Sequence, residues 1–209
     1  MNYSAVVTAA GKGERAGLGY NKVLYECKDG ETVLAHTVSV FLRDEDCTEI
    51  IVVTGEEEAK RLPADPRIRV TNGGKTRKDS VKNGLDLVQE DYVLVHDGAR
   101  PLLSEEALED VKKAVCEKEA VILARAVKET VKIAKDGVIG STIDRNTVFL
   151  AETPQAFETS LLRKAYDLAK EKEYTDEASL VEETGHPVHL VIDHDPNPKL
   201  TSPEDFKNL

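Results

Sequence analysis

Apolar residues are arranged along the chain in short runs and in longer periodic stripes. The short runs predict buried strands, and they lie at 3–8 (YSAVVT), 49–55 (EIIVVTG), 67–70 (RIRV), 120–124 (AVILA) and 187–193 (PVHLVID), with one more at the start of YVLVHDGARP (92–101). Between these runs, apolar residues three and four positions apart predict amphipathic helices. The alternation of strand and helix predicts an α/β fold.

The helices are predicted from stripes, caps and breakers. The stripes consist of Val33, Leu34, Thr37, Val40 and Phe41 within 31–44, and of Val81, Leu85 and Val88 after Lys78. Ser104 is placed to cap a helix whose first turn holds two glutamates, which suits the helix dipole. Further helices are predicted at 160–173, at 175–185 ending at Gly185, and after the Ser202-Pro203 start signal.

Uniformly apolar strands separated by helices predict a mostly parallel sheet with helices on both faces. In such sheets, ligands bind outside the carboxyl ends of the strands. The loops that begin at Thr8, Val70 and Val95 are therefore the segments most relevant to function.

Residues 127–145 (VKETVKIAKDGVIGSTIDR) interrupt the alternation and predict a β-hairpin. Asp136 and Gly137 form the dipeptide that favours a type I′ turn. A lone two-stranded hairpin is only marginally stable in water. We therefore expect it to pack on another part of its own chain or on a second subunit.

Composition and charge narrow the classes of function. The chain has 209 residues, 40% hydrophobic and 32% charged, enough for one α/β domain with a substantial core. A net charge of −11 disfavours non-specific nucleic-acid binding, so an anionic ligand needs a local group of cations. The cysteines at 27, 47 and 116 lack C-x-x-C spacing, which argues against a disulfide framework or a structural zinc. With no signal-peptide pattern and no apolar run of membrane-spanning length, we expect a cytoplasmic protein without a membrane segment.

A glycine-rich segment, TAAGKGERAG (8–17), follows the first strand. Its G-x-G-x-x-A pattern matches a dinucleotide fingerprint, but that fingerprint needs an acid about 20 positions later. The nearest acid after the second strand, Glu56, comes 45 residues after Gly11. A Walker loop needs Gly-Lys-Ser/Thr, which does not follow. Two interpretations remain: a tight turn without a ligand, or a triphosphate cradle formed by the backbone at Gly11 and Gly13.

Cations and one carboxylate near the predicted strand ends favour the phosphate interpretation. Lys12, Arg15 and Lys22 belong to or follow the first loop, and GGKTRKDS adds three more cations. Asp97 directly follows a buried strand, where a carboxylate could bind Mg²⁺ for a nucleotide. Taken singly, each lysine fits a solvated surface and Asp97 fits a cap equally well. Together they favour a nucleotide site.

Nine segments occur in the order and spacing of one family: AAGKGERA, NK, GGKTRKDSV, LVHDGARP, VKETVK, TIDR, TPQAF, TDEASLVE and NPKLTSPED. Over almost its whole length, the chain resembles the 2-C-methyl-D-erythritol 4-phosphate cytidylyltransferases. The resemblance implies transfer of CMP from CTP to methylerythritol phosphate, in the non-mevalonate route to isoprenoids. It also implies a Rossmann-like single domain over 1–209, Mg²⁺ as cofactor, and a homodimer whose 127–145 arm reaches the partner's active site.

The resemblance also assigns roles to individual positions. It implies CTP contacts for Ala9, Ala10, Gly11, Gly13, Lys22, Gly74, Lys75, Ser80 and Gly98. It implies contacts with methylerythritol phosphate for Arg100, Thr130, Arg145, Thr153, Thr175 and Lys199, several of them from the partner chain. It implies catalytic roles for Arg15, Lys22, Arg145 and Lys199, and a Mg²⁺-binding role for Asp97. The chain departs from the family pattern at Asn21, Lys75 and Pro198.

Two other functions stay open at this point. Ribitol-5-phosphate cytidylyltransferases share the loops and the TPQ run, although HDGARP and TIDR favour the methylerythritol enzyme. A non-catalytic nucleotide-binding regulator would keep a glycine loop but has little reason to keep Lys22, Asp97 and Arg145 together. The three histidines at 186, 189 and 194 are interpreted as surface or core residues, because on a strand His186 and His194 share one face while His189 points to the other.

The expected reaction is in-line attack of a substrate phosphate oxygen on the α-phosphorus of CTP. Both reactants are polyanions, so catalysis rests on positioning and on stabilisation of charge rather than on a general base.

Overall fold

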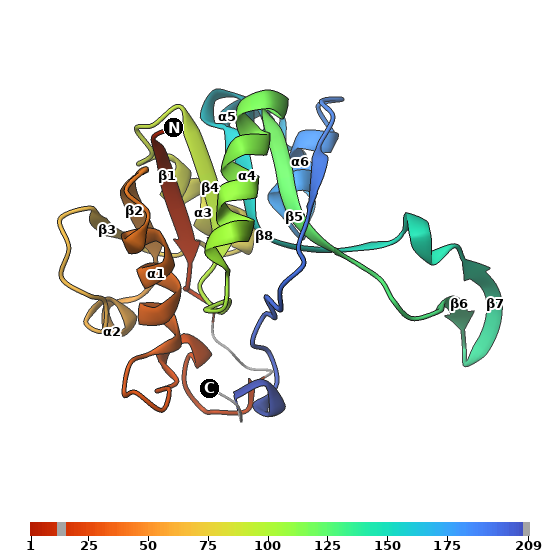
Figure 1. Ribbon diagram of the computed structural model, residues 1–209, viewed down its shortest axis with the longest axis horizontal. Helices are drawn as coiled ribbons and strands as arrows, with labels where there is room; N and C mark the ends of the chain where they lie inside the picture. The colour runs from red at the N-terminus through yellow and green to blue at the C-terminus, as the bar shows by residue number, and fades with distance from the viewer. Residues whose placement is uncertain (12–15, 207–209) are drawn as a thin grey trace.

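The computed structural model describes residues 1–11 and 16–206 and places one large sheet between two layers of helices (Figure 1). The strands are β1 (Tyr3–Thr8), β2 (Cys47–Val53), β3 (Ile68–Thr71), β4 (Tyr92–Asp97), β5 (Ala120–Ala126), β6 (Val131–Lys135), β7 (Val138–Ile143), β8 (Phe149–Glu158) and β9 (His189–Ile192). The helices are α1 (Val33–Arg43), α2 (Glu56–Ala59), α3 (Arg77–Leu85), α4 (Glu105–Lys118), α5 (Thr159–Leu168) and α6 (Glu177–Glu182). Short 3₁₀ turns are η2 (Lys22–Leu24), η3 (Arg145–Thr147) and η4 (Pro203–Phe206).

The main sheet has seven strands within the described residues, in the order β3-β2-β1-β4-β8-β5-β9. β1 pairs in parallel with β2 and β4, β2 with β3, and β5 with β9. β8 runs antiparallel between β4 and β5. The mostly parallel sheet predicted from the sequence is thus confirmed.

β8 is the strand that the apolar pattern did not predict. Its sequence FLAETPQAFE places polar side chains at Glu152, Thr153 and Gln155, and all three are buried. These side chains interrupt the continuous apolar run by which the other buried strands are recognised. Each must therefore find its hydrogen-bond partners elsewhere in the fold.

Helices cover both faces of the sheet, and the strand residues alternate between two cores. On one face of the sheet, α1 and α4 pack in a core with Ala5 and Val7 of β1. On the other face, α3, α5 and α6 pack in a core with Val6. This alternation follows from the two-residue period of a strand. Burial of apolar side chains on both faces explains why the strand sequences are uniformly apolar.

Local signals account for most helix boundaries. Thr32 caps α1 and Ser104 caps α4, each by accepting a hydrogen bond from the backbone three residues on. η4 begins at Pro203, as its start signal predicts. α5 ends at Leu168, five residues before the predicted end. The following KEKE run offers no apolar side chain to bury, and Lys170 N instead donates to the Tyr174 hydroxyl.

Residues 127–145 form the predicted hairpin, and β6 and β7 pair as a separate two-stranded sheet. Asp136 and Gly137 both have positive φ, 51° and 79°, as a type I′ turn requires. Figure 1 shows the hairpin projecting beyond β5 and β8. The apolar residues near its tip are exposed: Ile133 at 54%, Val138 at 70% and Ile139 at 62%.

Within residues 1–11 and 16–206, no helix combines the length and the apolarity needed to cross a membrane.

Candidate active site

A cavity of about 670 Å³ lies at the carboxyl ends of β1 and β4, beside the loop that follows β3. The end of β1 and the residues after it contribute Thr8–Gly11, the loop after β3 contributes Gly74–Arg77, and the end of β4 contributes Asp97. Lys22 and Lys199 complete the wall from η2 and from the segment after β9. The three strand-end loops named from the sequence are therefore brought together in one place.

The predicted site residues fall into three groups. Those that line the cavity are Ala9, Ala10, Gly11, Lys22, Gly74, Lys75, Ser80, Asp97 and Lys199. Gly98, Arg100 and Thr153 lie next to this wall and contact its members. Thr130, Arg145 and Thr175 are exposed and lie outside the lining. Gly13 and Arg15 lie outside the described residues.

The first loop is held open beside the cavity. Ala9 N donates to Val53 O (2.8 Å), and the Asn21 side-chain amide donates to Ala9 O (2.7 Å) and to Glu58 Oε1 (3.0 Å). A Cβ built at Gly11 would meet no atom within 4 Å, so a ligand can approach this backbone. Asn21 also caps η2, which carries Lys22. Asn21 was noted from the sequence only as a departure from the family, and the structure makes it a support of the loop.

Lys22, on η2, bonds to the segment that follows β9. Its Nζ donates to Leu200 O, directly after Lys199. The two lysines therefore stand on neighbouring parts of the wall although they are far apart in sequence.

The loop after β3 needs its glycines and is shaped by Ser80. A Cβ at Gly73 would lie 2.3 Å from Ala10 Cβ, and one at Gly74 would lie 2.3 Å from Asp79 Cβ. The Ser80 hydroxyl accepts from Gly74 N (3.0 Å) and donates to Thr76 O (2.9 Å). The backbone of this loop is thus fixed at close range to the first loop.

Asp97 is the carboxylate of the cavity wall, and it lies among cations. Its Oδ2 contacts Lys199 Nζ at 3.0 Å and Arg100 Nε at 3.3 Å. Burial alone raises the pKa of Asp97, but Lys199, Arg77 and Arg100 outweigh it and lower the pKa to about 2. The carboxylate therefore stays ionised at physiological pH.

A magnesium ion fits this donor set only together with a substrate. Mg²⁺ usually takes one or two carboxylates and completes its shell with water and substrate phosphates. Asp97 offers one ionised carboxylate at a cavity wall otherwise rich in cations and backbone groups. Because Lys199 and Arg100 already contact this carboxylate, an ion fits here only when a bound phosphate also attracts these two cations.

Behind Asp97 lies a buried hydrogen-bond network. Asp97 N donates to Thr153 Oγ1 (3.1 Å), which lies 3.0 Å from His96 Nδ1, and His96 Nε2 lies 3.1 Å from Arg100 O. A carbonyl oxygen only accepts, so Nε2 carries the proton and Nδ1 accepts from the threonine. Burial lowers the pKa of His96 to about 4, so the ring is neutral. The resemblance assigned the Thr153 hydroxyl to a substrate. Here the hydroxyl both accepts from Asp97 N and donates to His96 Nδ1 within the protein.

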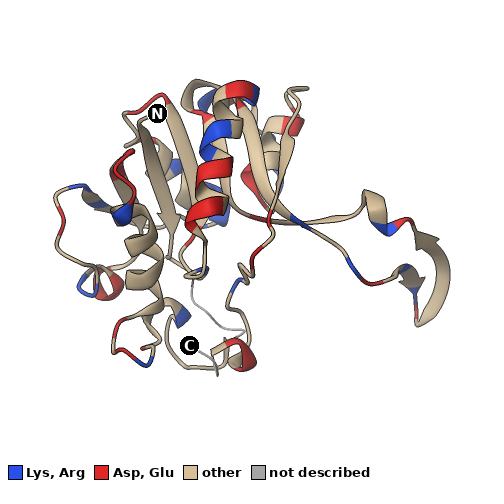
Figure 2. Cartoon of the chain, viewed as in Figure 1, with Lys and Arg blue, Asp and Glu red and all other residues tan. Residues whose placement is uncertain are grey.

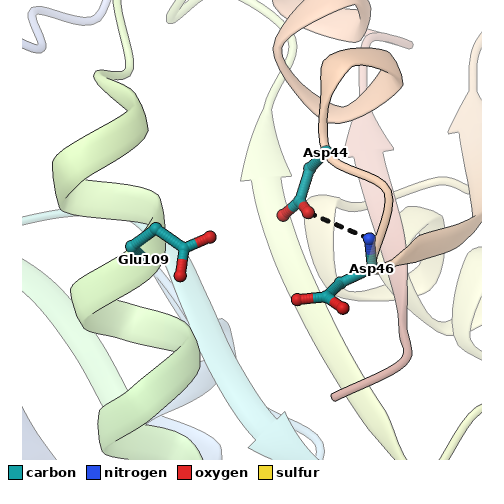
Figure 3. Close-up of side chains that lie close together, drawn as sticks. All are labelled: Asp44, Asp46 and Glu109. Carbon is teal, nitrogen blue, oxygen red and sulfur yellow. Dashed lines mark hydrogen bonds between the residues drawn. The ribbon is translucent and has the colours of Figure 1, made fainter.

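A second acidic group lies elsewhere, at the amino ends of the strands. Asp44, Asp46 and Glu109 are the group of acids close enough to hold a metal within the part of the chain that the structure describes (Figure 3). Lys112 Nζ, however, contacts all three, at 2.9, 2.6 and 2.6 Å. The Lys112 ammonium already lies at contact distance from all three carboxylates, where a metal ion would have to lie, so this group does not fit a metal ion.

The three histidines named from the sequence do not converge. His189 and His194 are exposed, and His186 lies 3.5 Å from Glu119. They belong to no metal-holding group among the described residues.

Arg77 is a charged residue of the wall that was not assigned a role from the sequence. Arg77 lines the cavity and donates to both carboxylate oxygens of Glu177, at 2.7 and 2.8 Å. The sequence showed Arg77 only as one of three cations in GGKTRKDS. Its partner lies 100 residues away, so no local pattern could indicate the pair.

Comparisons with known proteins point to one enzyme family over nearly the whole length of the chain. The family model described as IspD, 2-C-methyl-D-erythritol 4-phosphate cytidylyltransferase, matches residues 3–208. The enzyme of that name from Geobacillus kaustophilus is 43% identical, covering 99% of this chain and 94% of the relative, and that from Clostridioides difficile is 37% identical, covering 98% and 90%. The crystal structure of the Francisella tularensis enzyme has a TM-score of 0.86 at 31% identity, covering 100% of this chain and 98% of that one. The Thermus thermophilus structure has a TM-score of 0.83 at 31% identity, covering 99% and 96%.

Proposed function

This chain belongs to the 2-C-methyl-D-erythritol 4-phosphate cytidylyltransferase family, and from that premise we propose how its residues carry the reaction. The enzyme transfers CMP from CTP to 2-C-methyl-D-erythritol 4-phosphate in isoprenoid precursor biosynthesis. The products are 4-diphosphocytidyl-2-C-methyl-D-erythritol and pyrophosphate. The observation that carries the site assignment is the cavity in which two glycine loops, two lysines and Asp97 meet.

CTP occupies this cavity in our proposal. The backbone at Ala9, Ala10 and Gly11 faces the phosphates and the ribose, since Gly11 leaves open space beside it. Gly13 is assigned to the same contacts by its place in the glycine loop alone. Gly74, Lys75 and Ser80 line the part of the cavity that we assign to the cytosine base. Gly98, whose N–H donates to Thr8 O, lies next to the cavity wall. Because the Ser80 hydroxyl already bonds Gly74 N and Thr76 O, it acts by shaping the loop that reads the base.

Lys22 and Arg15 stabilise the negative charge that develops at the α-phosphate. Lys22 stands at the wall on a capped turn, so its ammonium is positioned before the reaction begins. Fixed charges of this kind act more strongly on the transition state than on the ground state. Arg15 is assigned by its place in the glycine loop alone.

Asp97 holds Mg²⁺ together with the phosphates of CTP in our proposal. Bound there, the ion would neutralise phosphate charge and orient the leaving pyrophosphate. Lys199, which lines the cavity, and the neighbouring Arg100 are both paired with Asp97, and we assign them to the phosphate of the second substrate.

We propose a homodimer in which the 127–145 arm of one chain serves the cavity of the other. Thr130 and Arg145, assigned to methylerythritol phosphate, are exposed on this arm, and Arg145 donates a hydrogen bond to the nearby Lys128 O. β7 carries no charged residue (Figure 2), and its Val138 and Ile139 are exposed. A projecting hairpin with one uncharged strand and exposed aliphatic side chains fits a second copy of the chain better than solvent. The rest of 1–209 forms one domain, and we place the enzyme in the cytoplasm.

The substrate assignment is tested by pyrophosphate release from CTP and Mg²⁺ with methylerythritol phosphate or ribitol 5-phosphate as acceptor. We expect a higher kcat/KM for methylerythritol phosphate. Preference for ribitol 5-phosphate would contradict the substrate assignment. CTP binding without turnover of either acceptor would favour the non-catalytic regulator.

A further inference from the structure

Arg77 joins two parts of the site that come from distant segments. It is the first residue of α3, directly after the glycine loop, and it lines the nucleotide cavity. Its two terminal nitrogens donate to the two carboxylate oxygens of Glu177, the first residue of α6. A bidentate guanidinium–carboxylate pair fixes orientation as well as distance.

The segment before α6 is held by further buried contacts. Gln155 Oε1 accepts from Glu177 N and Ala178 N, both at 3.0 Å, and Gln155 Nε2 donates to Asp176 Oδ2 at 3.0 Å. Tyr166 Oη donates to the carboxylate of Glu177, which is 1% exposed. Thr175, two residues before Glu177, is exposed at the end of this anchored segment.

The burial of Glu177 indicates that the pair is not incidental. A buried carboxylate is costly unless it is paired and hydrogen-bonded, and Arg77 supplies the opposite charge. Arg77 keeps about a quarter of its side chain, 27%, exposed at the cavity. The guanidinium therefore belongs both to the nucleotide wall and to the anchor of Thr175.

We propose that Arg77 is a positioning residue that acts through Glu177 to hold Thr175 in place for the phosphorylated polyol. Arg77 thus ties the position of the second substrate to the loop that surrounds the nucleotide. The inference rests on the proposed function, which assigns Thr175 to methylerythritol phosphate. Small displacements of a positioning group cost large factors in rate, because reacting atoms must be aligned.

The test compares Arg77→Lys, Glu177→Gln, Thr175→Val and the double variant Arg77→Lys/Thr175→Val. The CTP Kd is measured by calorimetry without the polyol phosphate, and kcat and the KM for methylerythritol phosphate are measured at saturating CTP. We expect each single variant to lower kcat/KM for methylerythritol phosphate at least tenfold while the CTP Kd changes less than threefold. The double variant is expected to be no more than about threefold worse than the poorer single variant, because both changes disable one function.

The matched control is Arg67→Lys, which removes another guanidinium from a bidentate pair. Arg67 contacts both oxygens of Asp65, at 3.1 and 3.2 Å, and three backbone carbonyls near the amino end of β2, whereas the cavity lies at the carboxyl ends of the strands. This variant is expected to keep both kinetic parameters within twofold. Retained CTP binding shows that each variant is folded, and Glu177→Asp replaces Glu177→Gln if the latter does not fold.

Three results would overturn the inference. A loss of CTP affinity equal to the loss in polyol kcat/KM makes Arg77 a direct nucleotide contact. Unchanged polyol kinetics in the folded variants makes the pair a structural brace alone. Losses that multiply in the double variant make Arg77 and Thr175 independent. Wild-type turnover of CTP with methylerythritol phosphate is measured first, so a failure of the proposed function is seen separately.

Discussion

Replacement of Thr153 by valine removes the hydroxyl between Asp97 and His96 while keeping the shape of the side chain. In the folded protein this hydroxyl accepts from Asp97 N at 3.1 Å and lies 3.0 Å from His96 Nδ1. The substitution leaves Asp97 N–H and His96 Nδ1 without a hydrogen-bond partner. Thr153 is 4% exposed and His96 is fully buried, so water has little access to either group. The imidazole cannot escape by changing tautomer, because Nε2–H is needed by Arg100 O.

The magnitude follows from the two polar groups left without partners. Each buried unsatisfied group costs about 1–3 kcal/mol, so Thr153→Val should lower the free energy of unfolding by about 2–6 kcal/mol. For a chain of this size, 1 kcal/mol shifts Tm by roughly 2–4 °C, which gives a fall of about 4 °C at least. Thr153→Ser keeps the hydroxyl and loses one buried methyl group, for about 1 kcal/mol.

Calorimetry of the wild type and both variants, with kinetics on the same samples, tests this reasoning. We expect the valine variant to be clearly less stable than the serine variant, and to have a lower kcat because the backbone at Asp97 is no longer held. Equal losses of stability in the two variants would refute the bridging role. If the valine variant is as stable as the wild type and only its KM for methylerythritol phosphate is raised, the Thr153 hydroxyl contacts the substrate, as the resemblance implies.

Two further substitutions test the charges of the site and of the strand behind it. Asp97→Asn leaves Lys199 and Arg100 without their carboxylate and should lower kcat/KM about 10²-fold or more, as for other preorganised charges; full rescue by excess Mg²⁺ would show that Asp97 only recruits the ion. Burial, and then the neighbouring Asp193, raise the pKa of Glu152 above its ordinary value, so the unfolded chain releases this proton at lower pH than the folded one. The free energy of unfolding therefore falls as pH rises through the ordinary range of about 4.3 and towards the raised pKa. The change in Tm caused by Glu152→Gln, measured against the wild type, should therefore be more favourable at pH 7 than at pH 4. A substitution that lowers Tm by the same amount at both pH values would contradict this origin.

The sheet and its helices could be predicted because their signals are local. Val81 and Leu85 share one face of α3, and Ser104 caps α4, from residues a few positions apart. The strand-end rule for parallel sheets then placed the glycine loops and Asp97 at one edge. These loops line the same cavity.

β8 and the contacts behind the cavity could not be predicted, because their partners are distant in sequence. Gln155 is buried in β8 only because backbone and side chain at 176–178 satisfy its amide. Thr153 is buried because His96 and Asp97 N bond its hydroxyl. Without knowledge of those contacts, three polar side chains within a few residues of one another argue against a buried strand.

The central claim is that each catalytic site combines the cavity of one chain with the arm of its partner. Lys22→Ala and Arg145→Ala should each be nearly inactive as homodimers. In a two-fold dimer with exchanged arms, a mixed dimer collects both lesions in one site and leaves the other intact, so random assembly restores about a quarter of wild-type sites. The deciding measurement is therefore the turnover of co-expressed, differently tagged variants. Activity near a quarter of the wild type is the expected result, and activity no higher than that of the separate variants, with mixed dimers present, would contradict the shared site.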